Sequence, residues 1–127
     1  MKPLAAIVLA SVASTAGAGV LQECGGNAVN PPGVLACLRE ARDAATDDML
    51  EQFLGIEQAI AGLGDEASAA RGALKRSQRA FELYVLEHCH GLQLVLAGEA
   101  ASLACEVELL RQRAETLETL DFGGARI

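Results

Sequence analysis

The stretch LACLREARDAATDDMLEQFLGIEQAIAGL, residues 35–63, indicates the fold class most clearly. Its apolar side chains recur at steps of three and four residues, at Leu35, Leu38, Ala41, Ala45, Met49, Phe53, Ile56, Ile60 and Leu63. This spacing places side chains on one face of an α-helix, and charged side chains fill the positions between them. We therefore predict a long amphipathic helix that begins near Val34 or Leu35 and ends before Gly62 and Gly64.

Two later segments have the same helical spacing. The first runs from about residue 66 to 90, with Asp65 as its expected cap and Gly91 as its expected end; its inward side chains are predicted to be Ala67, Ala70, Leu74, Ser77, Phe81, Tyr84 or Val85, and His88. The second runs from about residue 99 to 120, with Leu103, Val107, Leu110, Ala114, Leu117 and Leu120 inward.

In the stretch GGNAVNPPG, residues 25–33, we expect no regular element. No segment alternates as a strand does, so we predict an all-α fold, a small antiparallel three-helix bundle.

Residues 1–18 have the pattern of a secretory signal peptide. Lys2 supplies the basic start, an apolar run follows, and Ala16, Gly17 and Ala18 form a small-residue cleavage site. The apolar run has about ten residues, whereas a bilayer-spanning helix needs roughly 20. We predict cleavage after Ala18, which leaves residues 19–127 as one helical domain with its core at about 24–120. Glu23 is too large and charged for a lipidation site at Cys24, so we expect a periplasmic or secreted protein without a membrane anchor.

The charge balance is acidic, and this narrows the class of partner. Without Lys2, nine basic side chains remain against 17 acidic ones. Proteins that bind nucleic acid use basic patches to neutralise phosphates, so we expect no nucleic-acid partner. An acidic surface instead favours approach to a basic protein, although solubility alone also explains it.

The four cysteines are Cys24, Cys37, Cys89 and Cys105. Export would place them in an oxidising compartment, where an even number of cysteines indicates disulfides. Three pairings are formally open, and proximity along the chain favours Cys24–Cys37 and Cys89–Cys105. Two such bonds would add on the order of 3 kcal/mol each in the loop-entropy description and would staple the predicted bundle.

Catalytic and metal-binding patterns are missing from the sequence. It has no Gly-rich phosphate loop, nucleophile elbow or HExxH motif, so we predict that the protein is not an enzyme and uses no cofactor. His88, Cys89 and His90 form the one metal-like cluster. Neighbouring residues on a helix point about 100° apart, and an oxidised cysteine donates no thiolate, so we predict no metal site there.

The segment from Leu74 through Gln78, Arg79, Phe81 and Tyr84 to His88 and Cys89 resembles the Gln-containing helix of the LprI-like family, which is named for a lysozyme inhibitor. The order of the four cysteines is similar too, and Arg113 and Leu117 match the Arg and Leu that follow the family's last cysteine. The resemblance covers roughly residues 24–120. It departs from the family pattern at Phe81, which replaces a Trp, at Val85-Leu86, which replaces Arg-Asp, and at Glu51, which replaces an Asn.

The resemblance implies an exported helical domain and, for some members, inhibition of lysozyme. The favoured hypothesis is therefore a non-enzymatic binding protein whose partner is a basic protein such as lysozyme. The alternative is a structural or stress-related envelope protein without an enzyme target. For Gln78 we expect a structural hydrogen bond to a buried backbone group or a neighbouring helix, for Arg79 an ion pair with a carboxylate of the first helix, and for Phe81 and Tyr84 places in the core.

Overall fold

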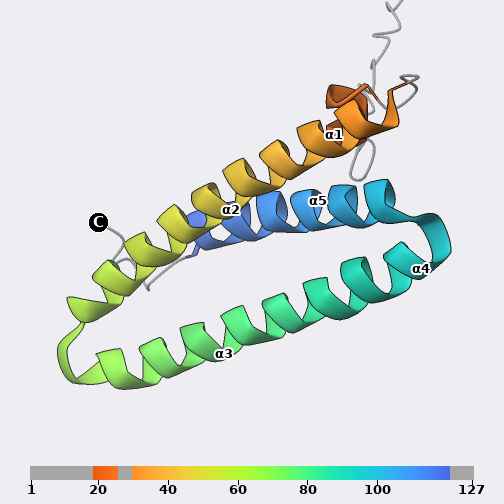
Figure 1. The fold of residues 1–127 in the computed structure, drawn as a ribbon. Helices are drawn as coiled ribbons and strands as arrows, with labels where there is room; N and C mark the ends of the chain where they lie inside the picture. The colour runs from red at the N-terminus through yellow and green to blue at the C-terminus, as the bar shows by residue number, and fades with distance from the viewer. Residues whose placement is uncertain (1–18, 26–29, 121–127) are drawn as a thin grey trace, which may run out of the picture.

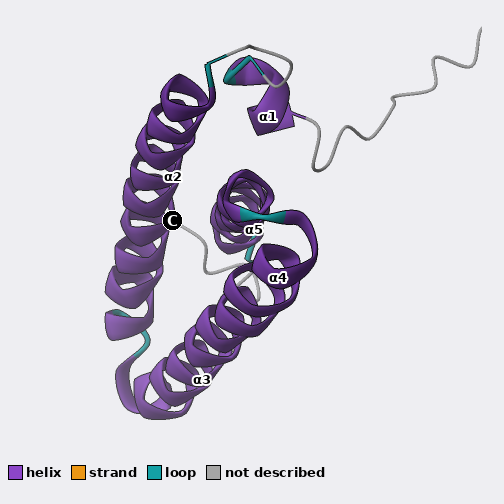
Figure 2. Cartoon of the chain, turned by 45° about the vertical axis from the view of Figure 1, so that its right-hand side comes forward, coloured by secondary structure: helices purple, strands orange, loops and turns teal. Residues whose placement is uncertain are grey.

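The computed structural model describes residues 19–25 and 30–120, and all regular structure in these residues is helical (Figure 1, Figure 2). In chain order the elements are α1 (Gly19–Glu23), α2 (Pro31–Ala61), the 3-10 turn η1 (Gly64–Glu66), α3 (Ala67–Val85), the π-helical segment η2 (Leu86–Gln93), α4 (Leu94–Ala97) and α5 (Glu99–Glu118). The prediction of an all-α fold is confirmed. The predicted signal peptide at 1–18 and the chain from residue 121 onward lie outside the described residues.

Helix α2 begins three residues before the predicted start, so the expectation that Pro31 and Pro32 exclude regular structure is wrong. Both prolines occupy the first positions of the helix, where a backbone N–H has no intrahelical acceptor and its loss costs nothing. The side chain of Asn30 caps this end by accepting a hydrogen bond from the Gly33 N–H at 3.3 Å. Proline therefore marks the start of this helix instead of a preceding loop.

The core lies mainly between α2 and α5, which run in the same direction (Figure 1). Along α2 the predicted apolar stripe is inward, and its fully or nearly fully buried members are Leu38, Ala45, Met49, Ile56 and Ile60. Along α5 the predicted stripe is buried at Leu103, Val107, Leu110, Ala114 and Leu117. Leu120 is exposed beyond the end of α5, so its predicted inward position is wrong.

Helix α3 packs differently. It starts beside the end of α2, diverges from it, and approaches α5 only near η2 (Figure 2). Its buried residues are few: Ala67, Leu74, Gln78 and Val85. Of the predicted pair Tyr84 or Val85, Val85 is the buried member and Tyr84 is exposed. Ser77, also predicted inward, is exposed because it lines a pocket where α3 diverges from α2.

Gly91 does not end the second long helical stretch, which continues through η2 and α4 to Ala97. A glycine lowers helix stability by about 1 kcal/mol, but it forces a stop only where the backbone needs a positive φ. That position is Gly98, with φ of 93°. Asp65 is not the cap of α3 either, because it lies inside the η1 turn and no side chain caps the helix at Glu66.

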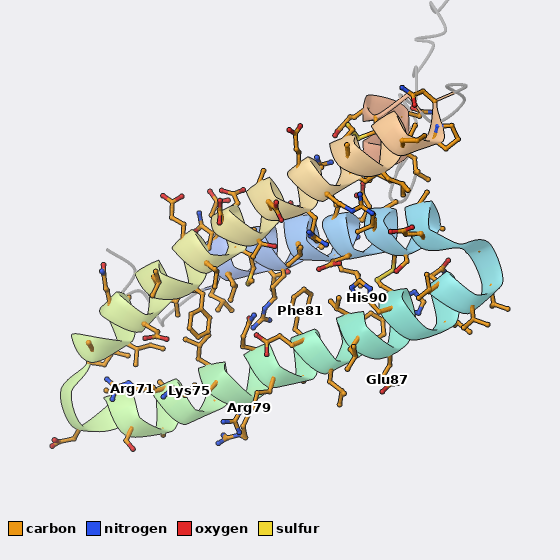
Figure 3. All side chains as sticks on the ribbon, viewed as in Figure 1. Arg71, Lys75, Arg79, Phe81, Glu87 and His90 are labelled. Carbon is orange, nitrogen blue, oxygen red and sulfur yellow. A yellow bond between two sulfur atoms is a disulfide. The ribbon has the colours of Figure 1, made fainter. Side chains whose placement is uncertain are left out.

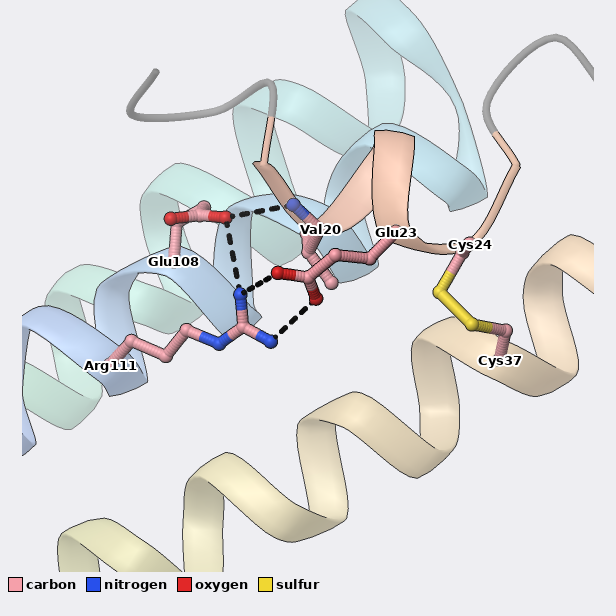
Figure 4. The surroundings of a disulfide bond; sticks show 6 residues. All are labelled: Val20, Glu23, Cys24, Cys37, Glu108 and Arg111. Carbon is pink, nitrogen blue, oxygen red and sulfur yellow. Dashed lines mark hydrogen bonds and ion pairs between the residues drawn. A yellow bond between two sulfur atoms is a disulfide. The ribbon is translucent and has the colours of Figure 1, made fainter. Parts of the chain in front are cut away.

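Two disulfides connect the helices, and the favoured pairing is confirmed: Cys24–Cys37 and Cys89–Cys105. The first ties α1 to the start of α2 (Figure 4). Helix α1 also docks on α5, since the fully buried Val20 donates its N–H to Glu108 at 3.2 Å and Glu23 accepts two hydrogen bonds from Arg111, at 2.8 and 3.2 Å. The second disulfide ties η2 to α5, where α3 has its firmest attachment.

Candidate binding surfaces

Gln78 is the polar centre of the space between α3 and the α2–α5 pair. It is only 8% exposed, it donates to the Met49 sulfur of α2 at 3.2 Å, and its Oε1 accepts from Arg113 Nε of α5 at 3.1 Å. A weaker bond of 3.5 Å reaches Glu82 on its own helix. The amide of Gln78 therefore connects three helices. This is the expected structural role, a hydrogen bond to a neighbouring helix.

Arg113 is held by Gln78 and by an aromatic ring but has no carboxylate partner among the described residues. Its guanidinium carbon lies 5.6 Å from the ring centroid of Phe81, a cation–π arrangement. Its Nη2 atom is shielded from water and donates to no described acceptor. Burial lowers the pKa of Arg113, because removing a charged group from water disfavours the charged form.

The other family-motif residues divide between core and surface. Leu74 and Leu117 are buried, and Phe81 is partly buried in the space that faces α5 (Figure 3). Arg79 projects away from the other helices and forms no ion pair with a described residue, so its predicted pairing with α2 is wrong. Tyr84 is also exposed and stacks on His88 at 5.0 Å, so its predicted place in the core is wrong.

The His88-Cys89-His90 segment lies in η2, and its three side chains serve three different contacts. His88 stacks on Tyr84, and Cys89 is in the disulfide with Cys105. His90 turns toward α5 (Figure 3), where its Nε2 lies 2.7 Å from Glu106 Oε2. The side chains therefore do not converge on one point, and among residues 19–25 and 30–120 no group of three potential ligands is arranged around a metal position.

The sequence did not predict that a serine, a histidine and a carboxylate lie next to one another. Two of the three come from α5 and are far from the histidine in the sequence. Ser102 Oγ lies 3.3 Å from His90 Nδ1, and Glu106 lies at the other ring nitrogen. This is the composition of a hydrolytic triad. However, Ser102 is 2% exposed, and its backbone N–H is bonded to Gly98 within the helix. The hydroxyl is thus almost enclosed between η2 and α5 and links the two elements, and Ser102 and His90 both contribute to the lining of a pocket of about 340 Å³.

Two pockets lie in the space between α3 and the α2–α5 pair, one on each side of the Gln78–Arg113 hydrogen bond. The pocket toward η2 has a volume of about 300 Å³ and includes Phe81, His90 and Glu106 in its lining. The pocket toward η1, which we call the Arg113 pocket, has a volume of about 360 Å³ and a mostly apolar lining. Both exist because α3 diverges from α2.

The outer face of α2 carries a row of carboxylates that we call the α2 acidic stripe, formed by Glu40, Asp43, Asp47 and Glu51. Steps of three and four residues place them along one side of the helix, and all four are exposed. Asp43 faces Arg42 at 3.4 Å, while the other three form no ion pair with a described residue. Beside the stripe, Leu50 and Leu54 are 45% and 56% exposed.

Helix α3 carries a cluster of basic side chains. The first two-thirds of α3 bear Arg71, Lys75, Arg76 and Arg79, all exposed. Basic side chains therefore predominate on α3, whereas acidic side chains predominate on α2 and α5. No helix among the described residues is long and apolar enough to cross a membrane.

No protein-family model, curated protein or solved structure matches this chain at a significant level. The resemblance to the LprI-like family therefore stays a prediction from the residues that carry it.

Proposed function

We propose that this protein is an exported, non-enzymatic binding protein that engages a cationic protein, with inhibition of a basic lysozyme as the first activity to test. The observation that carries the proposal is the α2 acidic stripe beside the exposed Leu50 and Leu54. A row of exposed carboxylates, three of them without an ion-pair partner among the described residues, attracts a cationic surface over a distance of about 8–10 Å at physiological ionic strength. Exposed leucines then supply apolar area that is buried on contact.

The disulfides, the burial of Ser102 and the arrangement of the helices support, in turn, export, a binding role and the bundle architecture. The two disulfides suit a protein of an oxidising compartment, which favours export. Burial of Ser102 favours a binding role over hydrolysis, because Ser102 is the nucleophile that lies beside a histidine and a carboxylate among the described residues. We interpret the architecture as an antiparallel three-helix bundle in which the middle member, α3 with η2 and α4, diverges from α2. This interpretation rests on the helix order and the short turn at η1.

The test is a muramidase assay with the purified domain, residues 19–127, both disulfides formed. We expect a stoichiometric excess to slow cell-wall lysis by a basic lysozyme, with a weaker effect as salt is raised, because salt screens exposed charges. Unchanged lysis at both low and moderate salt would show that lysozyme is not the target.

A pair of charge reversals locates the binding surface. Asp47→Lys with Glu51→Lys reverses the centre of the α2 acidic stripe and should weaken binding by about tenfold at low salt. Glu115→Lys with Glu118→Lys makes the same change in net charge at exposed positions of α5 and serves as the matched control. Equal weakening by both pairs would mean that only net charge matters and that α2 is not the contact surface.

The alternative, a structural or stress-related envelope protein, predicts a different phenotype. Deletion of the gene would then alter envelope integrity while sensitivity to lysozyme stayed normal. Direct binding of a basic lysozyme that depends on Asp47 and Glu51 would decide against it.

A further inference from the structure

The Arg113 pocket combines an apolar lining with one partly buried cation. Its apolar walls come from α2, from α3 and from the residue beyond α5: Ile56, Ile60, Ala70, Ala73, Leu74 and Leu120. Its polar lining consists of the hydroxyls of Ser77 and Thr116 and the guanidinium of Arg113. Arg113 is therefore the only charged group that lines this pocket in the described part of the chain.

The guanidinium of Arg113 lacks a counter-charge there. Gln78 satisfies Nε and the Phe81 ring covers one face, but Nη2 is enclosed without an acceptor. A charge that is removed from water is unfavourable unless an opposite charge and hydrogen bonds compensate it. The lowered pKa of Arg113 has the same physical origin, since burial disfavours its charged form. An anion at this position would supply the missing acceptor.

We propose that the Arg113 pocket binds an amphipathic carboxylate, a free medium-chain fatty acid, with the carboxylate on Arg113 and the alkyl chain against Ile60 and Leu74. The planar guanidinium matches a carboxylate in a two-point hydrogen-bonded geometry. The volume of about 360 Å³ is at the small end of ligand pockets, which suits a single unbranched chain. This site is separate from the α2 acidic stripe, which lies on the outer face of α2, so each can fail without the other.

The direct test is calorimetric titration of the disulfide-bonded protein with sodium decanoate below its micelle concentration. We expect one decanoate per chain and an affinity about fifteenfold above that of octanoate, because each of the two further buried methylenes contributes roughly fourfold. 1-Decanol has the same chain without the charge and should bind at least about tenfold more weakly than decanoate. Equal affinity for decanoate and 1-decanol would overturn the proposal.

Two variants test separately whether binding needs the charge of Arg113 and whether it needs the volume of the pocket. Arg113→Gln removes the cation and should weaken decanoate binding by at least about tenfold while changing 1-decanol binding little. Ala73→Leu fills the pocket from an exposed position of α3 and should weaken binding of both compounds. It leaves Arg113 in place, so it decides the question even if Arg113→Gln fails to fold.

Ala80→Leu is the matched control, because it adds the same group at another exposed position of α3 that does not line the pocket. Equal loss of binding in Ala73→Leu and Ala80→Leu would contradict the location of the site. A last comparison uses the chain ended at Leu120. Binding that appears only in this shortened chain would assign the anion to residues 121–127 themselves and would also overturn the proposal.

Discussion

The interface between α2 and α5 and the inner face of α3 differ in what holds them. The first is closed and apolar, with Leu38, Val107 and Leu117 almost completely buried. The second has a polar group, Gln78, at its centre and a pocket on each side of it. Helix α3 is therefore held by hydrogen bonds at its middle and by the η2 disulfide at its end, with less apolar packing than α2 or α5 has.

From this difference we expect a rigid half, formed by α2 and α5, and an adjustable half, formed by α3. Close packing between α2 and α5 leaves few alternatives to the observed arrangement. An element with few buried apolar contacts opens at a lower free energy than the rest of a domain. The Arg113 pocket lies at the boundary of these halves, so we expect α3 to adjust around a ligand there while the core between α2 and α5 stays unchanged.

The largest expected effect comes from leucine truncation in the two halves. Leu117→Ala should lower the free energy of unfolding by about 4 kcal/mol, because Leu117 is enclosed on all sides. Leu74→Ala removes the same atoms on α3 but should cost only about 2 kcal/mol, because Leu74 already lines the Arg113 pocket and has fewer neighbours to lose. Urea unfolding of both variants measures the difference, and equal losses would show that α3 is as tightly packed as α5.

Removal of each disulfide should have a similar global cost and different local effects. The two bonds close loops of similar length, with separations of 13 and 16 residues, so each double Cys→Ser replacement should cost about 3 kcal/mol. Without Cys89–Cys105, amide exchange should rise at least about tenfold in η2 and the adjoining part of α3, while α2 stays protected. Without Cys24–Cys37 the increase should be confined to α1 and the start of α2. The same exchange pattern in both variants would contradict a separate attachment of α3.

The Gln78–Arg113 hydrogen bond should show coupling. Gln78→Leu should cost about 2 kcal/mol, because it leaves Arg113 Nε enclosed without its acceptor. Arg113→Met removes that unsatisfied donor, so the double variant should be about 1 kcal/mol more stable than the sum of the single effects predicts. Additive effects in urea unfolding would mean that the amide contributes by packing alone.

The sequence predicted the rigid half well and the adjustable half less well. In α2 and α5 the apolar stripe of each helix packs mainly against the other helix, so the periodicity of residues such as Met49, Ile60 and Val107 predicts burial directly. In α3 the stripe gives no such answer, because periodicity does not say whether a neighbouring helix lies close enough to cover Ser77 or Tyr84. Divergence of helices is a property of the tertiary arrangement and leaves no mark in the spacing.

Two further features were outside the reach of local patterns. Ser102 and Glu106 could not be matched with His90 from sequence, because a helix–helix contact between η2 and α5 brings them together. Arg113 could be named from the family resemblance, but its lack of a counter-charge depends on which carboxylates the fold places elsewhere, such as Glu23 and Glu108 beside Arg111. The disulfide pairing was predictable because proximity along the chain agreed with the helix order.

The smallest expected effect concerns the docking of α1 on α5, which depends on exposed charges. The hydrogen bonds from Arg111 lower the pKa of Glu23 below 4.5, so the folded state holds this proton less tightly than the unfolded state. The contribution to stability is therefore fully present above about pH 4.5 and is lost as the pH falls through the lowered pKa. Glu23→Gln should cost about 0.5 kcal/mol at neutral pH, since exposed ion pairs are weak, and nothing near pH 2.

Glu118→Gln is the control for this last measurement, because Glu118 is exposed and forms no ion pair with a described residue. Urea unfolding at both pH values should give a pH-dependent difference for Glu23→Gln and none for Glu118→Gln. If Glu23→Gln still lowers the free energy of unfolding at pH 2, the side chain acts by packing. Helix α1 would then belong to the rigid half of the molecule together with α2 and α5.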